Sequence, residues 1–246
     1  MQAGFVNIFG KPNAGKSTLF NAMLGNKLSI ITDKAQTTRN RIKGFLNKKD
    51  EYQIILSDTP GILDPAYTLQ TKMMDVIHNA YQDTDVCIVL FDIKNTIQEL
   101  IEINDKIKLN APKICVLNKI DLISSNQLTE KIQQIEALQL FHAIIAISAL
   151  QHKGVDMLIK EVVQILPIHP PYYSQDDELS DLPVRFFIAE IIREKIFLLY
   201  QEEIPYHTNI EIESYKESPK IVKIKANIMV HRESQKIIII GLKGAK

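Results

Sequence analysis

The amino-acid sequence predicts an α/β protein, in which a mostly parallel sheet with helices on both faces precedes a smaller α+β unit. Over residues 1–166, short apolar runs rich in β-branched residues alternate with longer segments of helical period. After residue 182, one long amphipathic segment is followed by two segments that alternate apolar and polar residues. We therefore expect a first domain over residues 1–166, a linker over 167–181 and a second domain over 182–246.

Five apolar runs are expected to be strands that are buried on both faces, as strands of parallel sheets are. They cover residues 4–9, 52–57, 85–91, 113–118 and 142–148. Helical periodicity appears between them, over residues 16–24, 69–80, 97–109, 127–139 and 154–166. Residues 41–46 ("RIKGFL") alternate instead, which is typical of a half-exposed edge strand.

The stretch 166–183 ("LPIHPPYYSQDDELSDLP") contains four prolines and four acidic residues and has no periodicity, as expected of a linker between domains. Beyond it, residues 184–203 predict an amphipathic helix. Residues 207–215 and 220–232 predict two strands with a turn at "KESP" between them. A short apolar run, "IIII", then leads into the sequence "GLKG".

The charge is balanced overall, with 29 basic and 29 acidic residues, but it is unevenly distributed. From Lys220 to the end there are seven basic residues and one acidic residue, Glu233, so this stretch is locally positive. Cys87 and Cys115 stand in apolar runs, and we expect two buried free thiols in a reducing compartment. No signal peptide or membrane-length apolar run is visible, so we expect a cytoplasmic protein.

The sequence "GKPNAGKS" (10–17) has the pattern G-x-x-x-x-G-K-S, placed after a predicted strand and at the start of a predicted helix. Gly10 and Gly15 allow the backbone N–H groups to converge on phosphate at a helix N-terminus. Lys16 can then contact the β- and γ-phosphates, and Ser17 can offer its hydroxyl to Mg²⁺. The residues assigned to nucleotide binding here are Gly10, Lys11, Pro12, Asn13, Ala14, Gly15, Lys16, Ser17 and Thr18.

Three further motifs at strand ends indicate which class of phosphate-loop protein this is, namely a GTPase. In "DTPG" (58–61), Asp58 can hold Mg²⁺ through water and Gly61 can donate its N–H to the γ-phosphate. In "NKID" (118–121), the Asp121 carboxylate can accept two N–H groups of guanine, a pairing that adenine cannot offer. "SAL" (148–150) is expected to close the base pocket. The nucleotide-binding residues predicted from these motifs are Asp58, Thr59, Pro60, Gly61, Ile62, Asn118, Lys119, Asp121, Ser148, Ala149 and Leu150.

The segment 34–41 ("KAQTTRNR") lies between the first helix and the edge strand, where the first switch segment of a GTPase belongs. A threonine hydroxyl there would reach Mg²⁺ only when the γ-phosphate is present. Thr38 is our first choice and Thr37 the second, with a local Ser/Thr turn as the alternative for either. The predicted Mg²⁺ ligands are therefore Ser17, Thr38 and Asp58.

The position directly after the DxxG motif often holds a glutamine that orients the attacking water, but here it holds Ile62. In GTPases with an apolar residue there and an asparagine in the phosphate loop, a bound K⁺ can supply positive charge beside the phosphates. Asn13 occupies that loop position, and its alternative role is that of a turn residue. We name Lys16, Thr38, Gly61 and Asn13 as catalytic candidates, with K⁺ as a second candidate ion at Asn13.

The C-terminal helix, two strands, apolar run and "GLKG" predict the front portion of a KH-type RNA-binding module, whose G-x-x-G loop clamps single-stranded RNA. A helix-capping turn is the alternative interpretation of this motif. The RNA-binding residues predicted here are Lys236, Gly241, Leu242, Lys243, Gly244 and Lys246.

Taken together, these stretches resemble the Era family of bacterial GTPases, and the resemblance covers the whole chain. It is carried by "AGFVNIFGKPNAGKSTLFNAMLG", "LSIITDKAQTTRNRIKG", "SDTPGI", "NKIDL", "SAL", "RFFIAEIIREKIFLLYQEEIPY" and "HRESQKIIIIGLKGAK". The resemblance implies a P-loop GTPase domain and a type II KH domain that binds the 3′ end of 16S rRNA in small ribosomal subunit assembly. It also implies that the second domain is incomplete after the G-x-x-G loop, that the protein is a monomer, and that it associates peripherally with the inner membrane.

Two alternatives remain at this point. One is a K⁺-dependent GTPase of another branch, active in tRNA modification or transport, which would lack the C-terminal segments. The other is an RNA-binding module that uses GTP only as a structural switch.

Overall fold

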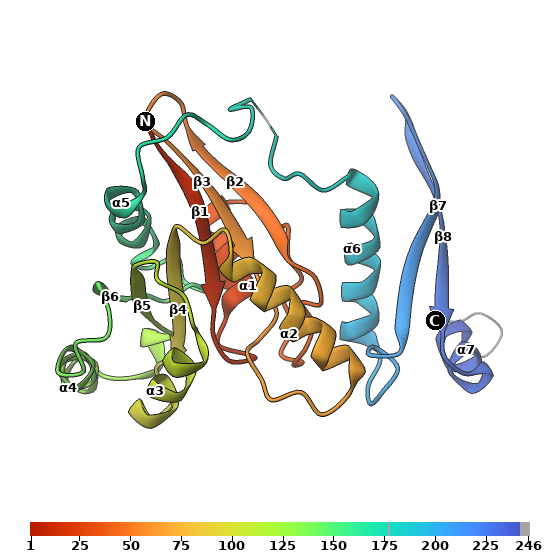
Figure 1. Cartoon of the computed structure of the whole chain (residues 1–246). Helices are drawn as coiled ribbons and strands as arrows, with labels where there is room; N and C mark the ends of the chain where they lie inside the picture. Colours follow the sequence, from red (N-terminus) through yellow and green to blue (C-terminus); the bar gives the residue numbers. More distant parts are fainter. Residues whose placement is uncertain (177, 242–246) are drawn as a thin grey trace. The chain divides into compact units, whose positions relative to one another are not determined.

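A computed structural model describes residues 1–176 and 178–241 of the chain (Figure 1). The chain divides into two compact units. Unit 1 comprises residues 1–29 and 35–181, and unit 2 comprises residues 30–34 and 182–246. Each unit is described separately below.

Unit 1 contains a six-stranded sheet with the order β2-β3-β1-β4-β5-β6. β2 is antiparallel to β3, and all other neighbours in this sheet are parallel. The strands are β1 (Gln2–Phe9), β2 (Ile42–Lys48), β3 (Tyr52–Asp58), β4 (Val86–Asp92), β5 (Lys113–Asn118) and β6 (Ala143–Ala146). The predicted mostly parallel sheet is thereby confirmed, and so is the edge position of the strand predicted at residues 41–46.

In the described part of unit 1, five α-helices accompany this sheet, as predicted: α1 (Lys16–Leu24), α2 (Thr68–Tyr81), α3 (Ile97–Lys106), α4 (Ser125–Glu136) and α5 (Val155–Ile165). α3 and α4 begin at capping boxes, in which Thr96 pairs with Glu99 and Ser124 pairs with Gln127. α3 ends at Lys106 rather than at the predicted residue 109. The ammonium of Lys113 donates to the carbonyl oxygens of Asn104 and Ile107 at this end, which satisfies acceptors that the helix leaves open.

The core of unit 1 forms because β4 and β5 are buried on both faces. Alternate residues of β4 (Cys87, Val89, Phe91) pack in one cluster with apolar residues of α2, α3 and α4. The two cysteines are buried and free, as predicted. Burial raises the pKa of Cys87 to about 12 and also raises the pKa of Cys115, so neither thiol is reactive at neutral pH.

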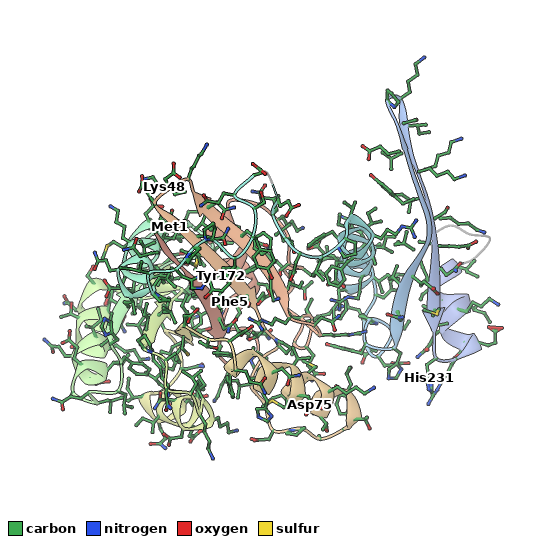
Figure 2. The ribbon with its side chains drawn as sticks, turned by 45° about the horizontal axis from the view of Figure 1, so that its top comes forward. Met1, Phe5, Lys48, Asp75, Tyr172 and His231 are labelled. Carbon is green, nitrogen blue, oxygen red and sulfur yellow. The ribbon has the colours of Figure 1, made fainter. Side chains whose placement is uncertain are left out.

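The predicted linker packs along β1, β2 and β3 of unit 1. The backbone N–H of Phe45 on β2 donates to the carbonyl oxygen of Leu179 at 2.9 Å. The ring of Tyr173 stacks on Phe45 with a centroid distance of 4.2 Å, and Tyr172 meets Phe5 edge-on at 4.9 Å (Figure 2). Residues up to 181 therefore count with the first compact unit.

Gln53 is the buried anchor of this docking. Its side-chain oxygen accepts the N–H groups of Tyr172 at 2.7 Å and Tyr173 at 3.0 Å. Its side-chain nitrogen donates to the carbonyl oxygen of Tyr173 and to Asn47 Oδ1, both at 3.0 Å. One fully buried amide thus satisfies three backbone groups of an otherwise irregular segment.

Unit 2 consists of residues 30–34, α6 (Val184–Leu199), the antiparallel hairpin β7 (Thr208–Ser218) and β8 (Ile221–Val230), and α7 (Glu233–Ile240). Its small core gathers Ile196, Tyr200, Ile204 and Ile210. α6 ends at Leu199 rather than at the predicted residue 203. Within this unit the ammonium of Lys34 donates to the carbonyl oxygens of Phe197 (2.6 Å) and Tyr200, which satisfies acceptors left open at the helix end.

Among the residues that the structure describes, no helix combines the length and the hydropathy needed to cross a membrane.

We expect Gln53→Ala to release residues 170–181 from unit 1. The substitution leaves two partly buried N–H groups without their acceptor, at a cost of about 1 kcal/mol for each. Limited proteolysis should cleave this segment faster in the variant, with a lower unfolding midpoint. Gln134→Ala, at an exposed position of α4, is the matched control and should change neither measurement. Wild-type proteolysis of the Gln53 variant would contradict this role.

Candidate functional site

The glycine-rich loop predicted to bind phosphate connects β1 to α1 at the carboxyl end of the parallel strands. Gly15 stands at the N-cap of α1 with a φ of 96°, a conformation that L side chains rarely adopt. A Cβ at Gly10 would lie 2.4 Å from the carbonyl oxygen of Leu90. A Cβ at Gly15 would lie 2.4 Å from Asn118 Nδ2. Only glycine therefore allows the loop to pack this closely on β4 and β5.

Lys16 lies at the centre of this loop with its ammonium buried. Its Nζ donates to the carbonyl oxygens of Gly10 at 3.2 Å and Lys11 at 2.9 Å. Burial lowers the pKa of Lys16 to about 8, and the nearby Asp58 carboxylate opposes that shift. An anion bound in the loop would favour the charged ammonium, which is the electrostatic property that a phosphate site requires.

Ser17, Thr38 and Asp58 come together from three separate segments. Ser17 Oγ donates to Asp58 Oδ2 at 2.7 Å, and Thr38 Oγ1 donates to the same oxygen at 3.2 Å. The two hydroxyls are 3.1 Å apart. Thr37, the second choice at the sequence level, is buried directly before Thr38, and it is the Thr38 hydroxyl that meets Ser17 and Asp58.

The Asp58 carboxylate is fully buried, and its Oδ1 has no hydrogen-bond partner in the described part of the chain. Desolvation raises the pKa of Asp58, although its hydrogen bonds with Ser17 and Thr38 and the charge of Lys16 act in the opposite direction. A buried carboxylate oxygen and two hydroxyl oxygens are the hard ligands that Mg²⁺ prefers. The residues therefore fit the predicted ion.

The DxxG segment is packed against the phosphate loop. Thr59 Oγ1 donates to the carbonyl oxygen of Ile8 at 2.6 Å. A Cβ at Gly61 would lie 2.8 Å from the ring and nitrogen of Pro12. The N–H of Ile62 donates to the carbonyl oxygen of Gly10 at 3.0 Å, and its side chain is only 3% exposed, within the core. Ile62 is thus a packing residue and offers no polar atom to water.

Asn118 joins three loops with one amide. Its Nδ2 donates to the carbonyl oxygen of Ala14 at 2.9 Å. Its Oδ1 accepts the N–H groups of Lys119 at 2.8 Å and Ala149 at 3.0 Å. The phosphate loop, the NKID loop and the SAL loop are therefore held in one arrangement by a side chain that is 2% exposed.

The remaining predicted residues surround this link. Lys119 Nζ donates to the carbonyl oxygen of Asn13 at 2.9 Å, and Asn13 is exposed with a φ of 62°. Asp121 is exposed in the 3₁₀ turn η1 (Ile120–Leu122). Ser148 is buried, and its Oγ accepts the N–H of Gln151 at 3.3 Å. Leu150 is 76% exposed and so contributes no packing to the loop core.

Sequence reasoning missed two carboxylates that support this site. Asp92 Oδ2 accepts Lys119 Nζ at 2.6 Å. Glu99 pairs with Lys11 of the phosphate loop at 2.7 Å, and this hydrogen bond is the main reason that the pKa of Glu99 falls to about 2. Asp92 ends the strand next to β5, so its position at a strand end was a usable signal. The Lys11–Glu99 pair spans 88 residues and has no local signal.

The predicted RNA-binding residues are described only in part. Lys236 lies on α7 and pairs with Glu233 at 3.2 Å. Gly241 follows α7 with a φ of 72°, and its N–H donates to the carbonyl oxygen of Ile237 at 3.0 Å. Leu242, Lys243, Gly244 and Lys246 lie outside the described residues.

Comparison with known proteins adds an independent line of evidence. Residues 5–119 match the family described as 50S ribosome-binding GTPase. The chain is 45% identical over 246 residues to the GTPase Era of Geotalea uraniireducens, covering 99% of the chain and 82% of that protein. It is 43% identical to the GTPase Era of Geotalea daltonii, covering 98% and 82%. The chain belongs to the Era family of GTPases.

Two solved structures of the Era family have the same fold. One is a variant of Aquifex aeolicus Era in which one tyrosine is replaced by alanine, bound to GDP and AlF₄⁻. It is 38% identical with a TM-score of 0.92 and covers 100% of this chain and 84% of its own. The other is Era in complex with MgGDPNP and nucleotides 1506–1542 of 16S ribosomal RNA. It is 39% identical with a TM-score of 0.92 and covers 99% of this chain and 84% of its own.

We expect Asn118→Ala to weaken binding of GTP and GDP equally in this Era-family protein, by about tenfold to a hundredfold. The variant loses three hydrogen bonds of about 0.5–1.5 kcal/mol each, none of which depends on the γ-phosphate. Fluorescent-nucleotide titration would measure both affinities. Asn104→Ala, at a similarly buried asparagine of α3 that contacts Lys113, is the matched control. Unchanged affinity in Asn118→Ala would refute the role assigned to this amide.

Proposed function

We propose that this Era-family GTPase binds GTP with Mg²⁺, hydrolyses it to GDP and phosphate, and binds the 3′ end of 16S rRNA during assembly of the small ribosomal subunit. The observation that carries the nucleotide part is the meeting of Ser17, Thr38 and Asp58 beside the buried ammonium of Lys16. These groups come from the three segments that a GTPase uses to sense the γ-phosphate.

Each part of the pocket has a distinct task in this proposal. The phosphate-loop N–H groups and Lys16 hold the β- and γ-phosphates, and the N–H of Gly61 contacts the γ-phosphate. Ser17, Thr38 and Asp58 hold Mg²⁺, whose charge offsets that of the phosphates. Asp121 selects guanine, while Asn118 and Lys119 shape the base pocket together with Ser148, Ala149 and Leu150.

Ile62 occupies the position of the glutamine and is buried in the core, so it cannot orient the attacking water. Another group must therefore stabilise the transition state of hydrolysis. We assign that role to K⁺ held next to the phosphates by Asn13. The exposed position of Asn13 on the phosphate loop supports this proposal, and its positive φ is equally compatible with a turn residue.

If K⁺ supplies this charge, GTP hydrolysis should be about tenfold faster in KCl than in NaCl at equal ionic strength. The difference should disappear in Asn13→Gly, which keeps the positive φ of the loop and removes the side-chain oxygen. Single-turnover phosphate release measures both rates. Equal rates of the wild type in the two salts would leave Asn13 as a turn residue only.

The RNA part of the proposal rests on the Era relative whose structure contains nucleotides 1506–1542 of 16S rRNA and on the charge of unit 2. Residues 182–246 carry 11 basic and 8 acidic residues, whereas residues 1–181 carry 18 and 21. The order of α6, β7, β8 and α7, followed by Gly241, is compatible with a KH-type module. Monomeric state and peripheral membrane association stay predictions of the family resemblance.

We expect the double substitution Gly241→Asp and Gly244→Asp to reduce affinity for an RNA oligonucleotide with the 16S 3′ end by at least about tenfold. Two carboxylates at the loop would repel phosphate and block close backbone approach. GTP hydrolysis without RNA should stay at the wild-type rate. Gln133→Asp with Gln134→Asp, two exposed residues of α4, adds the same charge as a control. Wild-type RNA affinity of the glycine variant would refute the KH assignment.

A further inference from the structure

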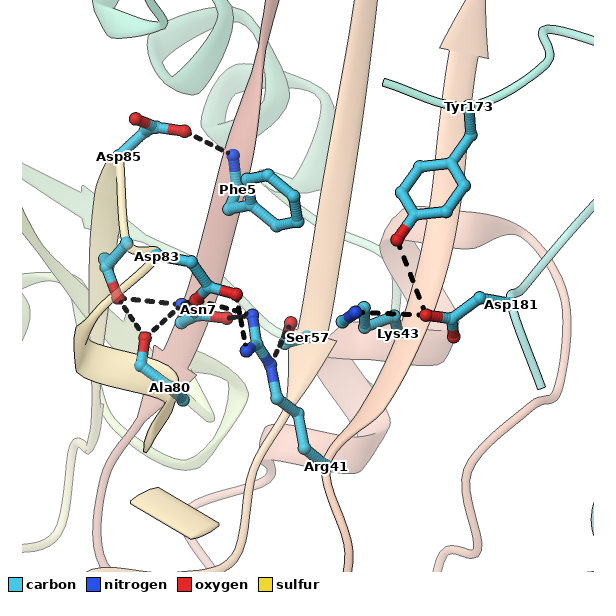
Figure 3. A network of polar contacts seen from close by, with 11 residues as sticks. Phe5, Asn7, Arg41, Lys43, Ser57, Ala80, Asp83, Asp85, Tyr173 and Asp181 are labelled. Carbon is cyan, nitrogen blue, oxygen red and sulfur yellow. Dashed lines mark hydrogen bonds and ion pairs between the residues drawn. The ribbon is translucent and has the colours of Figure 1, made fainter. Parts of the chain in front are cut away.

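Arg41, at the end of the first switch segment, lies at the centre of a polar cluster in unit 1 (Figure 3). Its guanidinium forms a two-pronged ion pair with Asp83, with Nη1–Oδ2 at 2.7 Å and Nη2–Oδ1 at 2.8 Å. Nε donates to Ser57 Oγ at 3.0 Å, and Nη2 also donates to Asn7 Oδ1 at 3.0 Å. One side chain therefore contacts β1, β3 and the end of the segment that follows α2.

The acceptors around Arg41 are held in place by other contacts. Asn7 is fully buried, and its Nδ2 donates to the carbonyl oxygen of Ala80 at 2.9 Å and to Thr84 Oγ1 at 2.7 Å. These two contacts fix the orientation of the Asn7 amide, so that its oxygen faces the guanidinium. The Asn7 acceptor therefore has a fixed position relative to the Arg41 guanidinium.

Each anchored segment continues directly into the nucleotide site. Arg41 follows Thr38 by three residues, and Ser57 immediately precedes Asp58. Asn7 precedes Gly10 of the phosphate loop by three residues. Since Arg41 belongs to the segment that carries Thr38 and its guanidinium contacts the other two, it fixes the spacing between the backbones that carry Thr38, Asp58 and the phosphate loop.

The Arg41 side of the ion pair is sheltered from solvent, since its side chain is 15% exposed, whereas that of Asp83 is 35% exposed. The planar guanidinium of Arg41 donates four hydrogen bonds in fixed directions, an arrangement that the ammonium of a lysine cannot reproduce.

We propose that Arg41 is a positioning residue that sets the spacing of Thr38 and Asp58 for Mg²⁺ and the γ-phosphate. The proposal rests on the Mg²⁺ site described above. According to the proposal, loss of the Arg41–Asp83 pair lowers the affinity for the Mg²⁺-bound triphosphate only. If the pair merely stabilised the fold, its loss would lower the affinities for GTP and GDP equally.

The test compares two affinities in each variant: that for a non-hydrolysable GTP analogue with Mg²⁺, and that for GDP in the presence of a chelator. We expect Arg41→Ala to weaken the first about tenfold, within the range of coupling energies of such networks, and to leave the second within about twofold. The Mg²⁺ concentration for half-maximal binding of the analogue should rise in parallel. Lys43→Ala is the matched control, because Lys43 lies two residues after Arg41, on β2, and pairs at 3.0 Å with Asp181, outside the cluster.

Asp83→Asn tests the same pair if Arg41→Ala does not fold. The amide keeps the shape of the carboxylate but removes its charge, so we expect the same selective loss at a smaller size. In the double variant, the effect of Asp83→Asn should vanish, because its partner is already gone. Equal loss of both affinities, or no loss of either, would overturn the proposal. A wild-type protein whose affinity for the analogue is independent of Mg²⁺ would instead overturn the Mg²⁺ site itself.

Discussion

The three hydrogen bonds of the Asn118 side chain are the contact on which the geometry of the pocket depends. They connect the carbonyl oxygen of Ala14 with the N–H groups of Lys119 and Ala149, so that the loops after β1, β5 and β6 share one support. The parallel arrangement makes this possible, since it brings the carboxyl ends of these strands to the same edge of the sheet. Gly15 completes the arrangement, because any larger residue would displace the Asn118 amide.

The nucleotide pocket contains two buried side chains of opposite charge, Lys16 and Asp58. Burial lowers the pKa of Lys16 and raises the pKa of Asp58, so desolvation destabilises the charged form of both. Each group is partly compensated by the charge of the other. A triphosphate adds negative charge beside the Lys16 ammonium, and a divalent cation adds positive charge beside the Asp58 carboxylate. Binding of both ligands therefore offsets the desolvation cost of these two buried charges.

The sequence was sufficient to predict the fold class, the order of the motifs along the chain and the grouping of the phosphate, DxxG and NKID loops. Those predictions succeed because each motif follows a buried strand and therefore reaches the same edge of the sheet. Contacts between distant residues were not predictable in this way. The hydrogen-bond partners of Arg41 are Asn7, Ser57 and Asp83. These three residues are far apart in the sequence and share no motif that would predict their contact.

The end of α6 illustrates the same limit for secondary structure. Helical periodicity continues to residue 203, yet the helix ends at Leu199, where the Lys34 ammonium binds the carbonyl oxygens of Phe197 and Tyr200. A residue 163 positions away thus provides the donor for carbonyl oxygens at the helix end. Local propensity contains no information about such a partner.

The Arg41 contacts also limit the freedom of Thr38 within unit 1. The Arg41 guanidinium is hydrogen-bonded to Asp83 and Ser57, and Thr38 precedes Arg41 by three residues. A segment this short allows little movement, because each residue spans at most about 3.3–3.6 Å. Thr38 therefore contacts Asp58 from a stretch of chain whose following residues are held by a hydrogen-bonded cation.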